Sequence, residues 1–227
     1  GSRSQFVIGN SAVNGCEQLL NALKKADGTY MTYDEAVAKK IPLKYSGQWN
    51  TASANATACD EKGQGSPFLS YMYGVFLAEV EVDTKTGKVQ VVKMTLAADI
   101  GRIANKIVVD GQMYGGLAQG IGLALTEDFE DLKKHTTMAA CGIPYPKDIP
   151  DNLEAIYADS PRKLGPHGAS GCGEMPLTSP HAAIANAIYN ACGVRIIQLP
   201  ALPEKVLAGL QGREIPIVKR PIKDPAF

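Results

Sequence analysis

The sequence predicts an α+β fold in which a β-hairpin and its sheet pack against helices. Two stretches, 68–82 and 88–97, are rich in β-branched and aromatic residues, and the short segment 83–87 joins them, which is typical of a hairpin. Apolar residues recur at helical spacing before and after this hairpin. The chain has 227 residues, of which 45% are hydrophobic, so it is long enough for one large core or two modest ones.

The N-terminal part is predicted to be helical. Helical spacing of apolar residues indicates an amphipathic helix over 11–25, which the following Asp-Gly pair ends. Thr32 and Glu35 have the spacing of a capping box, in which two side chains satisfy free amides of a first turn, so a short second helix follows. Segment 46–67 has no steady period and is interpreted as a long surface excursion or as irregular strands packed on another part.

A glycine-rich helix is predicted over 105–125, after the hairpin. Each glycine inside a helix costs about 1 kcal/mol relative to alanine, so its glycines indicate close approach of another group. The remaining predictions are a connection over 132–151, a strand over 153–158, a turn over 165–173, a helix from Pro180 to Ala191 capped by Ser179 and closed by Gly193, a strand over 194–199, a helix over 203–210 ended by Gly212, and an extended tail over 214–227.

The charge balance argues against nucleic acid and membrane as partners. Lysine plus arginine and aspartate plus glutamate both number 23, so no excess charge favours binding to nucleic acid or an anionic bilayer. The longest apolar run, around 115–125, is far shorter than the roughly 18 residues that span a bilayer. The opening residues lack the features of a secretory signal, so the cytoplasm is the expected location.

The cysteines indicate neither zinc nor disulfides. They are an odd number, widely separated, and contain no Cys-x-x-Cys pair. They also lack the spacing of four thiolates that an iron–sulfur cluster needs. We interpret them as small buried hydrophobes: Cys16, Cys59, Cys141, Cys172 and Cys192.

The most informative stretch is GASGCGEMP, residues 168–176. Its glycines allow backbone conformations closed to other residues and let a ligand approach the main chain. Glu174 follows directly, and the proline after Met175 restricts the chain beyond. Such a turn would hold Glu174 rigidly at the floor of a pocket, as a general base requires. By spacing alone, a glycine turn that carries a surface glutamate explains the same pattern.

Three segments carry a resemblance to a known family: GPHGASGCGEMPLTSPHAAIANAIYNACGVRI, GQMYGGLAQGIGLALTEDFEDLKKH and the opening GSRSQ. They resemble the C-terminal portion of the molybdopterin-binding subunit in the xanthine oxidase family of molybdenum hydroxylases, and most of all the bacterial single-chain aldehyde oxidoreductases. The resemblance extends from Gly1 to Leu210. It implies that residues 1–227 form one cofactor-binding region of an incomplete subunit.

The resemblance implies roles for particular residues. Glu174 corresponds to the general base, which acts on a molybdenum-bound hydroxyl while an aldehyde is oxidised to a carboxylic acid with water as the oxygen source. Gln112 corresponds to a residue that hydrogen-bonds the pterin, and Gly173 to one whose backbone lies beside the metal. The implied cofactor is molybdopterin cytosine dinucleotide with molybdenum, and no side chain here is assigned as a metal ligand. The opening residues correspond to a segment that wraps the cofactor: Gly1, Ser2, Arg3 and Ser4.

The resemblance also implies that this chain is inactive alone. The iron–sulfur sites and further cofactor contacts would lie in an upstream portion of the same subunit or in a separate chain, and a dimer is allowed. Two alternatives stay open: a hydroxylase of N-heterocycles such as xanthine or nicotinate, and a non-catalytic assembly module, against which the presence of both Glu174 and Gln112 argues. A phosphate-binding-loop enzyme is excluded because no Gly-x-x-x-x-Gly-Lys-Ser/Thr string occurs.

Overall fold

The computed structural model describes residues 1–51, 57–129, 131 and 133–218, which cluster into two compact units. Unit 1 comprises Gly1–Tyr73, Ala98–Val109 and Tyr157–Gly173, and unit 2 comprises Gly74–Ala97, Asp110–Ile156 and the chain from Glu174 onward. Each unit draws on three separate stretches, so the division does not follow the order of the sequence. None of the described helices is long and apolar enough to cross a membrane.

Unit 1 contains the long helix α1 (Arg3–Leu23), which begins well before the predicted start at Ser11. Tertiary packing explains the longer helix. Phe6 is buried and its ring meets that of Trp49 edge-on, with ring centroids 5.6 Å apart. The first turns of α1 are therefore stabilised by a residue distant in sequence, and the periodicity of the opening residues does not reveal this contact.

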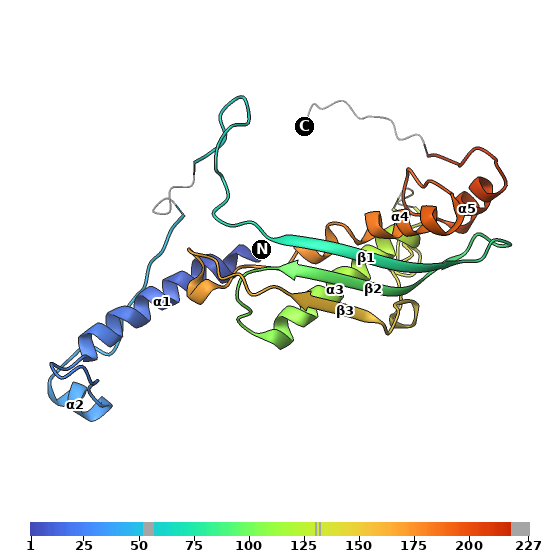
Figure 1. Ribbon diagram of the computed structural model, residues 1–227. Coiled ribbons are helices and arrows are strands. Elements are labelled where there is room, and N and C mark those ends of the chain that lie inside the picture. Colours follow the sequence, from blue (N-terminus) through green and yellow to red (C-terminus); the bar gives the residue numbers. More distant parts are fainter. Residues whose placement is uncertain (52–56, 130, 132, 219–227) are drawn as a thin grey trace. The chain divides into compact units, whose positions relative to one another are not determined.

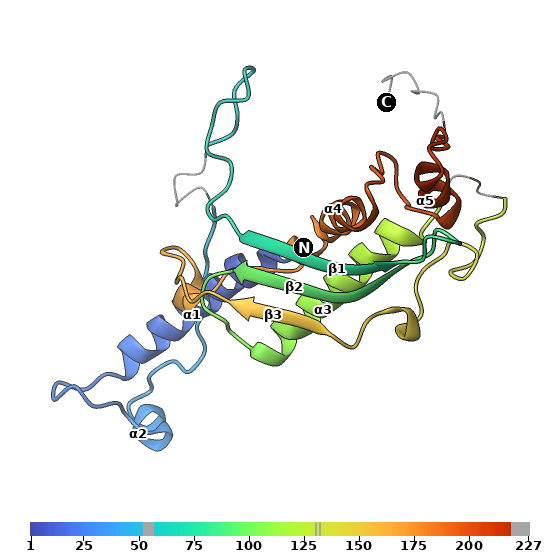
Figure 2. The ribbon, with the colours of Figure 1, turned by 45° about the vertical axis from the view of Figure 1, so that its right-hand side comes forward.

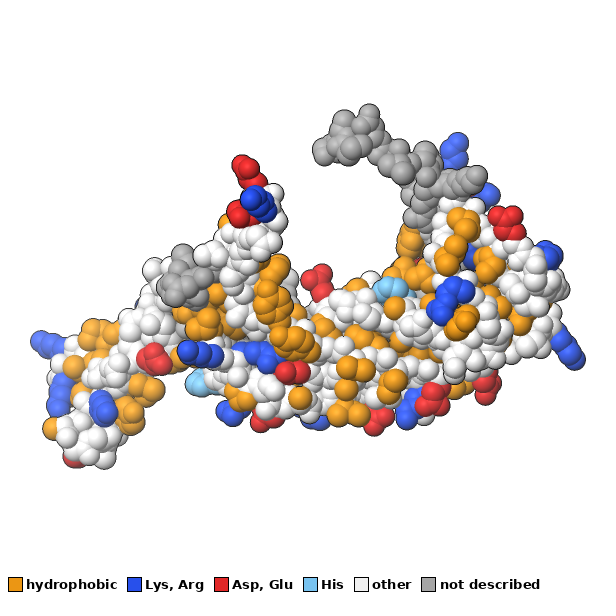
Figure 3. All heavy atoms as spheres, turned by 45° about the horizontal axis from the view of Figure 1, so that its top comes forward, with side chains coloured by type: hydrophobic (Ala, Val, Ile, Leu, Met, Phe, Trp, Pro, Cys, Tyr) orange, Lys and Arg blue, Asp and Glu red, His pale blue; other side chains and the backbone are white. Residues whose placement is uncertain are grey.

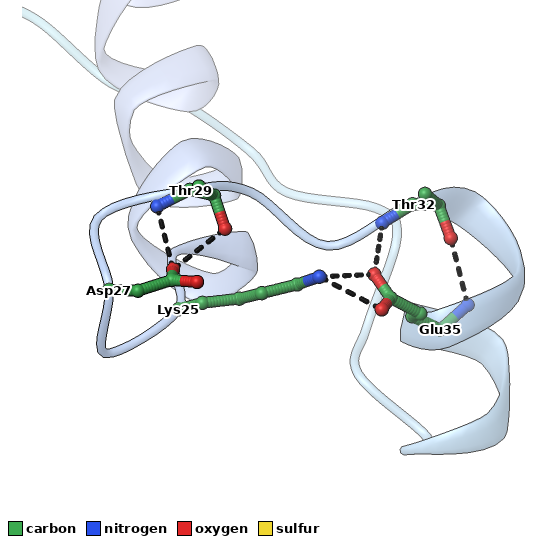
Figure 4. A network of polar contacts seen from close by, with 5 residues as sticks. All are labelled: Lys25, Asp27, Thr29, Thr32 and Glu35. Carbon is green, nitrogen blue, oxygen red and sulfur yellow. Dashed lines mark hydrogen bonds and ion pairs between the residues drawn. The ribbon is translucent and has the colours of Figure 1, made fainter.

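The second helix of unit 1, α2 (Tyr33–Ala38), confirms the predicted capping box. The Glu35 amide donates to Thr32 Oγ1 at 3.3 Å, and the Thr32 amide donates to Glu35 Oε2 at 2.8 Å. Lys25 adds an ion pair to Glu35 at 2.8 Å, and Asp27 accepts from both the amide and the hydroxyl of Thr29 (Figure 4). These contacts fix the turn between α1 and α2.

The predicted excursion over 46–67 fits the structure where it is described. Residues 52–56 lie outside the described part. In the rest of this segment no helix or strand forms, and an isolated bridge joins Thr57 to Ser66.

The predicted hairpin is confirmed. A three-stranded sheet runs in the order β1 (Tyr73–Val82), β2 (Val89–Asp99) and β3 (Leu153–Tyr157) (Figure 1). Asp83 closes the hairpin, because its amide donates to the Lys88 carbonyl at 2.9 Å and its side chain accepts from the Lys85 amide at 2.8 Å. β1 begins at Tyr73 and not at Phe68 as predicted, so residues 68–72 do not belong to the sheet.

Two helices cover the sheet of unit 2. The glycine-rich helix α3 (Lys106–Leu125) and α4 (Pro180–Cys192) both have the predicted positions and lie on the same side of the sheet (Figures 1 and 2). Gly193 closes α4 as predicted, and it does so in the left-handed conformation, whereas the Ser179 side chain makes no capping hydrogen bond. The core between the helices and the sheet includes the fully buried Met94, Leu96, Met113, Leu117, Ile184 and Ile188.

The predicted strand over 194–199 is wrong. This segment is irregular and ends in a cis Leu199-Pro200 peptide bond. Buried Lys205, in the correctly predicted helix α5 (Pro203–Leu210), donates from Nζ to the carbonyls of Gln198 and Pro200 at 3.1 and 3.0 Å. The apolar alternation here therefore reflects packing against a helix, not pairing in a sheet.

The remaining predictions are met in part. A short 3₁₀ helix, η2 (Pro146–Asp148), lies within the predicted connection, and Gly212 follows α5 with φ +66°. Residues 214–218 of the tail form no helix or strand, and the rest of the tail lies outside the described residues. Cys141 and Cys172 are buried and Cys192 is half-buried, but Cys16 and Cys59 are exposed, so the expectation of buried cysteines is wrong for those two.

Candidate functional site

The glycine turn, residues Gly165–Gly173 with the short 3₁₀ helix η3 (Pro166–Gly168), is held by main-chain hydrogen bonds in unit 1. The amides of Arg102 and Arg162 both donate to the Gly168 carbonyl at 2.9 Å. Gly168 has φ +87°, and a side chain there would bring its Cβ to 2.8 Å from Pro161 Cβ. Only glycine meets both conditions, because L side chains disfavour this φ and no room exists for a methyl group.

An ion pair between Arg162 and Asp99 lies next to this turn. Arg162 meets the carboxylate of Asp99, at the end of β2, with 2.9 Å between Nη2 and Oδ1. Burial raises the pKa of the Asp99 carboxyl, but hydrogen bonds from Arg162 and the Gly101 amide together outweigh that effect and leave the pKa below its usual range. The carboxylate is therefore the favoured form here.

The opening residues meet the glycine turn. Gly171 lies so close to the main-chain oxygen of Ser2 that a side chain at this position would collide with it. Beside this contact lies a cavity of about 260 Å³ within unit 1. Its lining combines polar groups of the opening and the turn with apolar groups of the segment before β1: Ser2, Arg3, Phe6, Val7, Thr51, Pro67, Phe68, Leu69, Ser70, Met72, Ser170 and Gly171.

The cavity wall contains a hydroxyl without a protein partner. Ser70 Oγ is buried and accepts or donates no hydrogen bond within the described part of the chain. A buried polar atom without a partner is costly, so such an atom in a cavity wall is suited to bind a ligand or ordered water. Arg3 brings a positive charge and several donors to the same cavity.

Glu174 belongs to unit 2, where its backbone is fixed and its side chain is exposed. Its carbonyl accepts from the Leu177 amide at 3.3 Å, and the short helix η4 (Met175–Leu177) buries Met175 and Pro176 directly after it. The Glu174 side chain is exposed, and it does not line the cavity described above. The role of Glu174 at the floor of a pocket stays a prediction.

Helix α3 runs next to the residues that follow Glu174. A methyl group at Gly116 would lie 2.5 Å from Pro176 Cβ, and one at Gly120 would lie 2.5 Å from Pro180 Cγ. Gln112 stands one turn before Gly116 on the same face of the helix. Unit 2 therefore brings the backbone segments of Gln112 and Glu174 into the same neighbourhood.

The glycines of α3 differ in their surroundings. Gly116, Gly120 and Gly122 have near neighbours, as predicted, but Gly111 and Gly115 have no described atom within 4 Å of an added Cβ. Gln112, between these two, is exposed. The described residues therefore leave space open beside Gly111 and Gly115.

The predicted site residues thus fall into two groups. Unit 1 joins Ser2 and Arg3 to the turn that ends in Gly173, while Gly1 and Ser4 are exposed and do not line the described cavity. In unit 2, the helix that carries Gln112 packs at Gly116 against the segment after Glu174. Sequence reasoning missed Ser70, because the aromatic residues around it were interpreted as the start of a strand.

A family model for the molybdopterin cofactor-binding domain matches residues 1–150. The chain belongs to this family of molybdopterin cofactor-binding domains. The matched range includes the opening residues, the cavity segment before β1 and Gln112. The α+β arrangement of unit 2 is the one found in this family's solved members.

Individual relatives extend the likeness beyond the matched range. The aldehyde oxidoreductase of Megalodesulfovibrio gigas is 58% identical over 212 residues, which are 93% of this chain and 23% of that protein. The crystal structure of the aldehyde oxidoreductase from Desulfovibrio gigas superposes with a TM-score of 0.88 at 57% identity, again over 93% of this chain and 23% of the other. The probable hypoxanthine oxidase of Escherichia coli is 33% identical over 66% of this chain and 16% of its own. This molybdopterin cofactor-binding chain therefore spans less than a quarter of the relatives it matches.

Proposed function

We propose that this chain is the C-terminal portion of the molybdenum-binding subunit of an aldehyde oxidoreductase, and that it holds one end of the cofactor and supplies the catalytic base. The observation that carries the proposal is the cavity of unit 1. Two residues predicted to wrap the cofactor, Ser2 and Arg3, line it together with Ser170 of the glycine turn.

The lining of the cavity supports a site for the dinucleotide end of molybdopterin cytosine dinucleotide. Phosphate oxygens accept hydrogen bonds from arginine and serine side chains, and Arg3, Ser2 and Ser170 offer such donors. The buried Ser70 hydroxyl has a free hydrogen-bonding capacity for the same ligand. Aromatic and apolar residues on the opposite wall, such as Phe68, suit a nucleotide base.

The glycines at the start of α3 suit the flat pterin. An added Cβ at Gly111 or Gly115 would meet no described atom within 4 Å, so a planar ligand could lie against the helix there. Gln112 between them has an amide that can both donate and accept hydrogen bonds.

The chemistry implied is the conversion of an aldehyde and water into a carboxylic acid, two protons and two electrons. The molybdenum centre, when bound, would accept the two electrons. Glu174 would accept a proton at its carboxylate from the oxygen that attacks the aldehyde carbon. Its rigid backbone serves this role, and its exposed side chain leaves room for the substrate and for walls supplied by the rest of the enzyme.

The remaining portion of the subunit or a separate chain would supply the iron–sulfur sites. The relatives are more than four times as long as the matched part, which leaves ample sequence for them. The electrons removed from the aldehyde would leave through those clusters.

The substitution Glu174→Gln tests the role of the base in the complete enzyme. An amide of the same shape cannot accept the proton, so kcat should fall by about 10²- to 10⁴-fold while molybdenum and pterin content stay unchanged. Steady-state aldehyde oxidation and elemental analysis measure the two quantities. Glu79→Gln, on the exposed face of β1, is the matched control. A Glu174→Gln enzyme with a third of the wild-type rate would rule out the assigned role.

The substitution Gln112→Ala tests the contact between α3 and the pterin. Loss of the amide should lower the pterin content of the purified complete enzyme, measured by the fluorescence of the extracted and oxidised pterin. Gln119→Ala, also exposed on α3 and two turns further along, should leave the content at the wild-type value. Full pterin retention in the Gln112→Ala enzyme would argue that α3 does not contact the cofactor.

A second candidate is an N-heterocycle hydroxylase, which the 33% identity to the probable hypoxanthine oxidase favours. The 58% identity to an aldehyde oxidoreductase favours the aldehyde. Turnover of benzaldehyde compared with xanthine by the complete enzyme distinguishes the two substrates.

A further inference from the structure

We propose that Arg162 is a positioning residue that fixes the two walls of the cofactor cavity relative to each other, an inference that rests on the proposed function. Arg162 does not line the cavity. It contacts the segments from which both walls emerge, and all of these segments belong to unit 1.

The first wall is the glycine turn. The Arg162 amide donates to the Gly168 carbonyl at 2.9 Å, two residues before the cavity-lining Ser170. Gly101 also packs here, because a methyl group at Gly101 would lie 3.0 Å from Arg162 Cγ. The main chain and the side-chain stem of Arg162 therefore both limit where the turn can lie.

The second wall is the segment before β1, whose last lining residue is Met72. Tyr73 follows Met72 directly, and the guanidinium carbon of Arg162 lies 5.9 Å from the centroid of the Tyr73 ring. A guanidinium over an aromatic ring is an attractive arrangement. Arg162 thereby holds the end of the second wall.

The guanidinium is anchored to a third segment, the end of β2. Nη2 donates to the Asp99 carbonyl at 2.9 Å and pairs with Asp99 Oδ1, while Nη1 donates to Asp99 Oδ2 at 3.3 Å and to the Ser160 carbonyl at 3.2 Å. The two side chains are 15% and 25% exposed, so water competes little for these contacts. Only the planar fork of arginine reaches all these acceptors at once, because a lysine ammonium acts as a single point charge.

Positioning and simple electrostatic stabilisation make different predictions for lysine. If the positive charge alone mattered, Arg162→Lys would preserve the pair with Asp99 and behave like wild type. If the fork fixes the cavity walls, lysine fails to rescue, and the cofactor is held less tightly although the charge is unchanged.

The test is the rate of pterin release from the purified complete enzyme, followed by fluorescence of the released and oxidised pterin. Arg162→Lys and the nearly isosteric Asp99→Asn are compared with Glu35→Gln, which removes the Lys25 ion pair elsewhere in unit 1 and leaves a side-chain oxygen that can still accept from the Thr32 amide (Figure 4). We expect release to accelerate by about 10- to 100-fold in the first two variants, as for residues that orient the ligands of a metal site, and to stay at the wild-type rate in the third. Asp99→Asn keeps the test valid if the lysine variant does not fold.

The outcomes separate this inference from the proposed function. Wild-type release rates in both Arg162→Lys and Asp99→Asn would overturn the positioning role. Faster release in all three variants that simply follows their loss of thermal stability would overturn it as well. Arg3→Met provides the second comparison: if it releases pterin and Arg162→Lys does not, the proposed function stands and this inference alone fails. A wild-type enzyme without pterin would overturn both.

Discussion

At Glu174 the backbone and the side chain have different surroundings. The two residues that follow are buried, and the Glu174 carbonyl is bound by the Leu177 amide, whereas the carboxylate is exposed. A general base needs a backbone that holds it in place and carboxylate oxygens that are accessible to a proton donor. Glu174 has both features. The surface glutamate that spacing alone would suggest and the base that the resemblance implies are therefore compatible in the isolated chain.

Cys172 lies between two glycines of the turn, and its chemistry is suppressed there. It is buried, and burial raises the pKa of its thiol. A raised pKa means that less of the reactive thiolate is present at any pH below it. A cysteine in this turn therefore acts as a small apolar residue.

This difference predicts the pattern of alkylation in the 227-residue chain. Iodoacetamide at neutral pH should modify the exposed Cys16 and Cys59 and leave Cys172 and Cys141 intact, as measured by peptide mass spectrometry. Unfolding in urea should make all of them reactive, which serves as the control. Modification of Cys172 as fast as Cys59 in the folded chain would contradict the buried position of the turn.

Among the elements, those determined by local chemistry could be predicted and those determined by distant partners could not. The capping box at Thr32, the hairpin loop at Asp83 and the left-handed Gly193 each depend on neighbours within a few residues, and all were found. The start of α1 depends on the packing of Phe6 against a residue far along the chain.

Alternation of apolar residues predicts secondary structure less well, because it indicates that a segment is buried but not which element it packs against. The segment 194–199 alternates but packs against α5. Residues 68–72 resemble a strand in sequence, but all of them except Tyr71 line the cavity. For the same reason, Ser2 and Arg3 were accessible through resemblance, whereas Arg162 and Ser70 became visible only from their three-dimensional neighbours.

The two adjacent glycines of α3 give a direct test of why the helix contains them. Gly116→Ala would place a methyl group against Pro176 and should destabilise the chain by about 1–3 kcal/mol through overpacking. Gly115→Ala meets no described atom and should stabilise it by up to about 1 kcal/mol through helix propensity. Urea unfolding of the two variants measures the difference. Equal stability of both variants would show that α3 does not pack on the segment after Glu174.

At the scale of the whole molecule, much apolar surface is open to solvent. Hydrophobic side chains are spread over the visible face (Figure 3), and large ones such as Ile107, Tyr33 and Ile197 are at least 70% exposed. Extensive exposed apolar surface marks sites of interaction with other protein. It agrees with a chain that spans less than a quarter of the relatives it matches.

We expect this chain to form part of a molybdenum cofactor site, with Glu174 beside the metal and the cavity of Ser2 and Arg3 around the other end of the cofactor. The most direct measurement is a crystal structure of the complete enzyme with anomalous diffraction recorded at the molybdenum absorption edge. We predict an anomalous peak adjacent to the Glu174 carboxylate, with no other side chain between them, and density for a dinucleotide in the cavity. A molybdenum peak remote from Glu174, with the cavity filled only by water, would rule out both assigned roles.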